Sequence, residues 1–171
     1  MNRVLELQTI ADSHKDWWFF PTEPLVQGFL GTGKLFIVGD QPSNDHWEFE
    51  HPHRRAYYDV LAATGAGDSH LTDFYKRRGP AGQFAKGNPN DFPDFDKHLE
   101  VFCGEVKLLR PTTILALGWD AYHLLSKHTP ELQNIVERIW HFGTVRHGHL
   151  AEFQSRLRNA ITAARLRDGS N

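Results

Sequence analysis

Asp40 is the residue best placed to do chemistry, because it follows a short apolar segment, residues 35–38, through a single glycine. The segment is rich in β-branched and aromatic residues and predicts a buried strand over 34–39. Gly39 permits a sharp turn, and Pro42 restrains the backbone just beyond it. We therefore expect a carboxylate on a rigid loop at the carboxyl end of a buried strand, where open α/β sheets bind ligands. The structural alternative is a carboxylate that only caps the turn.

Three further groups of polar residues follow in the sequence. Residues 51–55 read His-Pro-His-Arg-Arg, residues 71–80 read Leu-Thr-Asp-Phe-Tyr-Lys-Arg-Arg-Gly-Pro, and residues 144–149 read Thr-Val-Arg-His-Gly-His. The basic run in the second group is suited to contacts with nucleic-acid phosphates, which set affinity and not sequence preference. A solvated charged face is the alternative interpretation of the same run.

The elements that must position these residues alternate between strands and helices. Strands are predicted at 34–39, 70–75 and 112–117, with a fourth inside 135–145. Helices are predicted at 4–18, 52–64, 94–109, 119–128 and 150–167, and residues 79–93 are rich enough in Gly, Pro and Asn to form a loop. This alternation predicts an α/β three-layer sandwich with a central, mostly parallel four-stranded sheet.

The composition bounds the class of protein. At 171 residues, with 40% hydrophobic and 23% charged residues, the chain is expected to form one domain, residues 1–171. The formal net charge of −2 gives no global electrostatic case for nucleic acid, although a local basic patch is compatible with it. The single cysteine, Cys103, excludes an intramolecular disulfide and any multi-cysteine zinc or iron–sulfur site. No signal or membrane-spanning pattern is visible, so we expect a cytoplasmic protein.

The order of these motifs resembles the uracil-DNA glycosylase superfamily, most closely its iron–sulfur class, over roughly residues 35–150. That class has Gly-Glu-Ala-Pro-Gly after the first strand, a Pro-Phe about ten residues later, then Thr-Asn-x-x-Lys-x-Arg-Pro-Pro and a closing His-Pro. Here the corresponding segments are Gly-Asp-Gln-Pro from Gly39, His-Pro-His before the helix, Thr-Asp-x-x-Lys-Arg-Arg, and His-Gly. Counting without gaps from Gly39 places Pro52 on the family's proline and His53 on its base-stacking phenylalanine.

The resemblance implies a role for each matched residue in hydrolysing an N-glycosidic bond to a base flipped out of DNA. Asp40 would act at the sugar and His147 would stabilise the departing base, as the two catalytic residues. The implied base-binding residues are Gly39, Gln41, His53 and Asp73, with His53 as the stacking platform. The implied phosphate contacts are Lys76, Arg77, Arg78 and Arg146. It implies a DNA partner, no membrane, a monomer and no cofactor, because the cluster cysteines are absent.

Asp73 is the departure that bears most on the substrate, since the family has Asn there to read uracil. An ionised Asp only accepts hydrogen bonds, so it would repel O4 of uracil and suit a base edge with two donors. This predicts a damaged or deaminated base other than uracil as the best substrate. If burial protonates Asp73, its carboxyl group can donate, and uracil becomes a candidate again.

Two other classes of function stay open. The His- and Asp-rich segment 40–53 contains enough nitrogen and oxygen ligands for a metal-dependent hydrolase, although its spacing matches no metal motif. Loss of activity on chelation would favour that class. A non-catalytic member of the superfamily, which binds nucleic acid or a base without cleaving, would instead bind a modified duplex without releasing the base.

Overall fold

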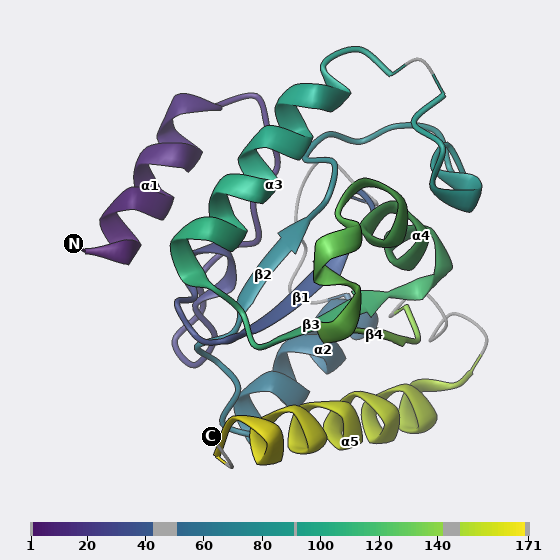
Figure 1. Cartoon of the computed structure of the whole chain (residues 1–171). Coiled ribbons are helices and arrows are strands. Elements are labelled where there is room, and N and C mark those ends of the chain that lie inside the picture. The colour runs from purple at the N-terminus through teal and green to yellow at the C-terminus, as the bar shows by residue number, and fades with distance from the viewer. Residues whose placement is uncertain (1, 43–50, 91, 142–147, 170–171) are drawn as a thin grey trace.

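The computed structural model describes residues 2–42, 51–90, 92–141 and 148–169 (Figure 1). Its centre is a four-stranded sheet in the order β2-β1-β3-β4, in which all neighbouring strands are parallel. The strands are β1 (Leu35–Gly39), β2 (His70–Asp73), β3 (Thr113–Leu117) and β4 (Val136–Ile139). The predicted α/β class with a four-stranded sheet is confirmed, and the sheet is wholly rather than mostly parallel.

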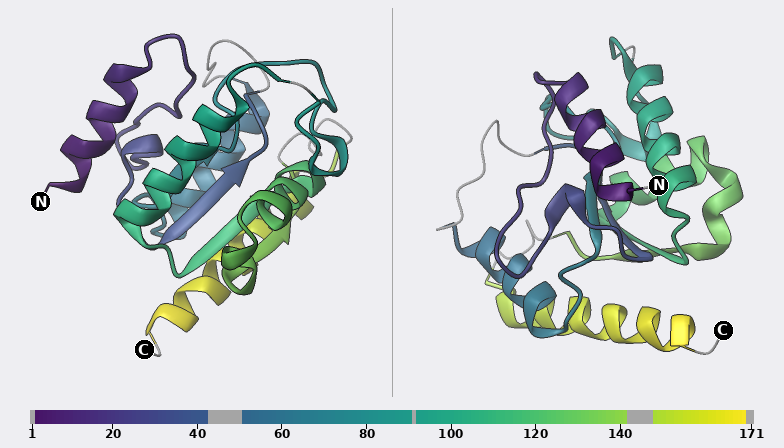
Figure 2. Two further views of the ribbon diagram at one scale, coloured as in Figure 1. Left: turned by 45° about the horizontal axis from the view of Figure 1, so that its top comes forward. Right: turned by 90° about the vertical axis from the view of Figure 1, so that its left-hand side faces the viewer.

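Helices cover both faces of the sheet and complete three layers (Figure 2). The α-helices are α1 (Arg3–Ser13), α2 (Pro52–Ala63), α3 (Phe95–Leu109), α4 (Gly118–His128) and α5 (Leu150–Gly169). Short 3-10 helices lie at η1 (Gly28–Leu30), η2 (Ala85–Gly87) and η3 (Pro130–Ile135). In Figure 2, α2 and α5 lie on one face, whereas α1, α3 and α4 lie on the other. Among the described helices, none combines the length and apolar character needed to span a bilayer.

The placement of the helices follows from the strand order. The chain moves from β1 to β2 in one direction across the sheet and from β2 through β3 to β4 in the other. Because parallel crossovers are right-handed, a reversal of direction sends the connecting helices to opposite faces. The reversal leaves a crevice between the carboxyl ends of β1 and β3, which is where such sheets bind ligands. All residues of β1, β2 and β3 are buried, as expected for strands covered on both sides.

The first helix is shorter than predicted, because α1 ends at Ser13 and residues 14–18 are irregular. The indole of Trp17 stacks on the ring of His98 in α3, with centroids 3.8 Å apart. The backbone N–H of Trp18 donates to the carbonyl of Lys76 at 2.7 Å. These tertiary contacts fix residues 14–18 against α3 and the end of β2, and they override the helical pattern.

Candidate functional site

A cleft of about 420 Å³ lies at the carboxyl edge of the sheet. Its lining comes from the segments that follow β1, β2, β3 and β4, and therefore from every strand of the sheet. The lining residues are Asp40, Gln41, Pro42, Arg78, Gly79, Ala81, Gly82, Leu117, Gly118, Trp119, Asp120 and His141. The cleft thus occupies the crevice that the strand order creates, and Asp40 lies in its wall.

Asp40 is held in place by the extension of β2. The backbone N–H of Phe74 donates to the carbonyl of Gly39 at 2.8 Å, and that of Tyr75 donates to the carbonyl of Asp40 at 3.0 Å. These bonds continue the pairing of β1 and β2 beyond their assigned ends. Burial is the main cause that raises the pKa of the Asp40 carboxyl to about 6. The nearby charge of Asp120 also raises this pKa, whereas hydrogen bonds from the backbone N–H groups of Asp40 and Gln41 lower it. Asp40 therefore changes charge close to neutral pH.

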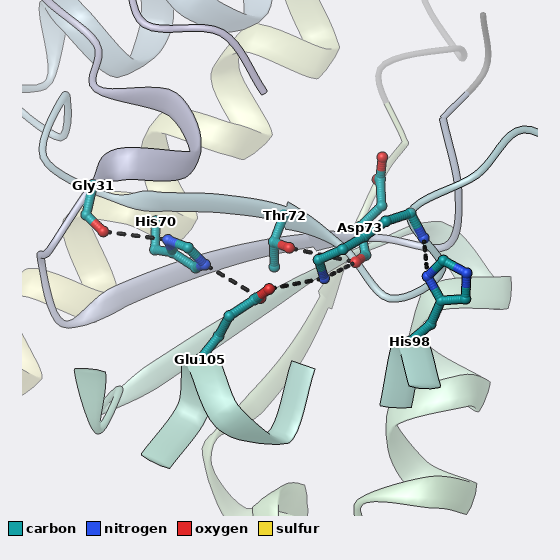
Figure 3. A network of polar contacts seen from close by, with 7 residues as sticks. Gly31, His70, Thr72, Asp73, His98 and Glu105 are labelled. Atoms are coloured by element: carbon teal, nitrogen blue, oxygen red, sulfur yellow. Dashed lines mark hydrogen bonds and ion pairs between the residues drawn. The ribbon is translucent and has the colours of Figure 1, made fainter. Parts of the chain in front are cut away.

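Asp73 lies beside Gly39 on the neighbouring strand and does not line the cleft. A Cβ atom on Gly39 would lie 2.1 Å from Oδ1 of Asp73, so any larger residue would require this carboxyl group to move. Figure 3 shows the side chain of Asp73 projecting to the opposite side of the strand from Glu105. Its Oδ2 atom is buried and has no hydrogen-bond partner in the described part of the chain. An orphaned buried carboxyl oxygen is rare and calls for a ligand or a functional reason.

Burial also controls the protonation of Asp73. It raises the pKa of this carboxyl group well above its usual range, Asp40 and Glu105 raise it further, and Lys76 acts in the opposite direction. The fold thus shifts Asp73 toward its protonated form, which can donate as well as accept a hydrogen bond. Of the two alternatives that the sequence left open for Asp73, this environment favours the neutral one.

Lys76 does not face solvent, and its predicted contact with DNA phosphates is wrong. The side chain is fully buried, with Nζ 2.9 Å from Oε1 of Glu105 and donating to the backbone carbonyl of Asp73 at 2.9 Å. His70 lies 3.3 Å from the other oxygen of Glu105, and its Nδ1 is 3.2 Å from the carbonyl of Gly31. Burial opposes ionisation of Glu105, but Lys76 and His70 outweigh it and hold its pKa below the usual range. The lysine thus fixes the end of β2.

The other two residues of the basic run remain at the surface. Arg78 is exposed and lines the cleft, whereas Arg77 is half-buried. The guanidinium of Arg77 forms an ion pair with Asp16 and lies 3.8 Å from Oδ2 of Asp94. Arg78 is therefore the member of the run that reaches the candidate site.

Gln41 lines the cleft, but its amide group is already bonded to the loop after β2. Its Nε2 donates to the carbonyl of Pro80 at 3.1 Å, and its Oε1 accepts from the N–H of Gly79 at 3.0 Å and from Nε2 of Gln83. Gln41 therefore joins two walls of the cleft, and its amide is not available to read a ligand in this arrangement.

Several predicted residues lie outside what the structure describes. His147 and Arg146 are among residues 142–147, and most of the segment proposed for metal binding falls in residues 43–50. His53 lies in the first turn of α2, but its side chain is not described. Among the described residues, no group of three or more His, Cys, Asp or Glu side chains is arranged to hold a metal ion.

Among the cleft residues that were not predicted, Trp119, Asp120 and His141 have aromatic or polar side chains that can contact a ligand. Helix α4 begins at Gly118, directly after β3, with a φ of +89° that favours glycine. A Cβ atom on Gly118 would lie 3.3 Å from Cβ of His141, so the end of β4 packs closely against this turn. The abrupt change from a buried strand to Gly-Trp-Asp was the signal that could have identified Trp119 and Asp120. No local pattern marked His141.

Comparison of the chain with protein-family models and with curated proteins finds no match in either set.

Proposed function

We propose that the protein hydrolyses the N-glycosidic bond of a damaged or deaminated base in DNA. The observation that carries the proposal is a pair of neighbouring carboxyl groups in different environments. Asp40 is partly exposed in the wall of the cleft and has a pKa of about 6, whereas Asp73 is buried with an unpartnered oxygen. Two neighbouring titratable groups that take different acid–base roles because their environments differ are typical of catalytic sites.

Asp40 acts on the sugar side in this proposal. As a carboxylate it stabilises positive charge that develops at C1′ or orients the attacking water. Water adds to C1′, the bond from C1′ to the base nitrogen breaks, and the base leaves with the bonding electron pair and takes up a proton. The products are the free base and an abasic site. His147 remains the proposed donor to the departing base, and His53 the proposed stacking platform.

In the same proposal Asp73, which lies beside Gly39 and does not line the cleft in this structure, would read the base once a nucleotide is bound. As a neutral acid it offers a donor and an acceptor, which is the pair that the Asn of the resemblance presents to O4 and N3–H of uracil. Uracil therefore joins hypoxanthine, xanthine and oxidised pyrimidines as a candidate. The motif order of the sequence and the four-stranded parallel sheet support the proposal.

The test is base release from oligonucleotides that carry each of these bases, with wild type and Asp40→Ala. We expect wild type to release at least one base and Asp40→Ala to release it at least about 100-fold more slowly. Equal release by both proteins would remove the catalytic assignment of Asp40. Binding without release by wild type would favour a non-catalytic binder.

Asp73→Asn tests how the base is read. If the neutral acid of Asp73 substitutes for Asn, the variant retains the base preference of wild type within about tenfold. If Asp73 acts as a carboxylate, the preferred base instead changes from one with two donors to uracil. Asp59→Asn, an exposed change on α2, is the matched control.

A further inference from the structure

A hollow of about 580 Å³ lies between α1 and α3, away from the cleft. Its lining residues are Arg3, Glu6, Gly104, Lys107, Leu108 and Arg110, and none of these six lines the cleft. Helix α3 ends beside the hollow and leads into β3 at the amino edge of the sheet, opposite to the edge that carries the cleft. Figure 1 shows α1 alongside α3. We call this space the α1–α3 hollow.

Gly104 leaves the α3 wall of the hollow open. It lies inside α3, where a glycine destabilises the helix relative to an alanine. In the described part of the chain, no neighbouring atom lies within 4 Å of a Cβ atom built on Gly104, and its φ is not positive. Neither packing nor backbone conformation therefore requires glycine at this position. A ligand that occupies the space above Gly104 would account for it.

The charge of the α1–α3 hollow favours an anion. Arg3, Lys107 and Arg110 are cationic, and no described carboxylate lies within ion-pair distance of any of them. Arg110 has a φ of +53°, and its backbone carbonyl accepts a hydrogen bond from Nζ of Lys34 at 3.0 Å, which holds the end of α3 in place. Two guanidinium groups and one ammonium group suit a phosphate group, which arginine binds in a bidentate manner.

Glu6 gives the hollow a hydrogen-bond acceptor. Its side chain is half-buried, and its Oε1 atom is shielded from solvent and has no hydrogen-bond partner in the described part of the chain. A carboxylate oxygen only accepts, so it requires a donor such as a hydroxyl group. The lining of the hollow contains no aromatic side chain on which a base could stack. These features together favour a ligand with a phosphate group and hydroxyl groups over a nucleotide.

We propose that the α1–α3 hollow binds a small sugar phosphate. Its phosphate group lies between Arg3, Lys107 and Arg110, and one of its hydroxyl groups donates to Glu6. The site is separate from the cleft, so this inference does not depend on the proposed function. A ligand held by residues of both helices joins α1 to α3 and stabilises the folded chain.

The test is calorimetric titration of the full chain with ribose 5-phosphate. We expect one saturable site with a Kd of about 1 mM or tighter, and an unfolding temperature that rises with the ligand concentration. Arg110→Gly should weaken binding at least about tenfold, because it removes a charge-assisted contact to the phosphate. The positive φ of Arg110 favours glycine, so this variant is expected to fold, and urea unfolding without ligand checks that. The matched control is Lys97→Gln, which removes an exposed cation from the same helix and should leave the affinity unchanged.

Glu6→Leu tests the sugar part of the ligand. We expect it to weaken the binding of ribose 5-phosphate several-fold, because a hydroxyl group loses its acceptor. The same change should leave the binding of inorganic phosphate as tight as before or tighter, since it removes a negative charge from the hollow.

The absence of saturable binding up to about 10 mM ribose 5-phosphate would overturn the inference, as would an equal loss in Arg110→Gly and Lys97→Gln. Inorganic phosphate that binds as tightly as ribose 5-phosphate would overturn it in favour of a simple anion site. Displacement of ribose 5-phosphate by a lower concentration of a five-nucleotide thymidine strand would overturn it in favour of a nucleic-acid backbone.

Discussion

Asp40 and Asp73 are neighbouring carboxyl groups that the fold treats differently. Asp40 lies in the wall of an open cleft, and Asp73 is buried beside Gly39. The pKa of Asp73 is raised by the burial of its own carboxyl group and raised further by the charge of Asp40. Keeping either group charged therefore costs stability, which is typical of residues retained for function.

The pKa of Asp40 predicts a gain in stability when its charge is removed. Its folded-state pKa of about 6 lies above the ordinary 3.8. The loss of folding stability caused by the ionised carboxylate is therefore absent below pH 3.8 and complete well above pH 6. We expect Asp40→Asn to raise the free energy of unfolding at pH 8 by about 2 kcal/mol, allowing for partial exposure, and to change it little at pH 3.5. Urea unfolding at both pH values measures this, and an equal effect at both would contradict it.

Gly39 is expected to be required because of Asp73 and not because of its own backbone. A Cβ atom there would meet Oδ1 of Asp73 at 2.1 Å. We expect Gly39→Ala to lower the free energy of unfolding by about 1–3 kcal/mol through overpacking. In the Asp73→Ala background the same change should cost much less, since the opposing oxygen is gone. A double-mutant cycle with no coupling between the two positions would show that the crowding has another source.

At the scale of elements, strand β2 carries much of the arrangement of the site. Its end is fixed by Lys76, which donates to the carbonyl of Asp73 and pairs with Glu105 of α3. Its extension bonds to Gly39 and Asp40. Helix α3 therefore supports the cleft from within the core.

Glu105→Leu tests this support. It leaves the buried ammonium of Lys76 without its carboxylate, and we expect a loss of about 3–5 kcal/mol in the free energy of unfolding. Adding Lys76→Met should restore most of that loss, whereas Glu100→Leu, an exposed change on the same helix, should cost little. The pKa of Glu105 lies below the ordinary 4.5, so its contribution is present above that value and is lost as the pH falls through the folded-state pKa. A double variant no more stable than Glu105→Leu would refute the pairing.

The elements were more predictable from the sequence than the site. Continuous apolar runs located β1 and β3, because strands buried on both faces have few polar positions. Strand β2 reads His-Leu-Thr-Asp and is buried despite its polar residues. Helix α1 was predicted too long, since the stacking of Trp17 on His98 is a long-range contact that local periodicity does not record. Lys76 was assigned to the surface for a related reason, because its carboxylate partner lies on another helix. The cleft residue His141 follows β4, whose position depends on the whole sheet.

At the scale of the whole molecule, the strand order brings separate segments to one edge. The cleft collects residues from the segments at the ends of all four strands. Arg78 and Asp40 both line this cleft, in a chain whose formal net charge is −2. An anionic and a cationic side chain in one cleft are what the proposed reaction would use at the sugar and at the phosphate.

The pH dependence of single-turnover base release tests the central claim most directly. With the best substrate of the panel, Asp40 must be ionised to act at the sugar, so the rate should be level above about pH 7 and fall tenfold per pH unit well below 6. Asp40→Asn should abolish this dependence and reduce the plateau at least about 100-fold. A wild-type rate that persists unchanged to pH 4, or an Asp40→Asn variant as fast as wild type, would contradict the assignment of this carboxylate to catalysis.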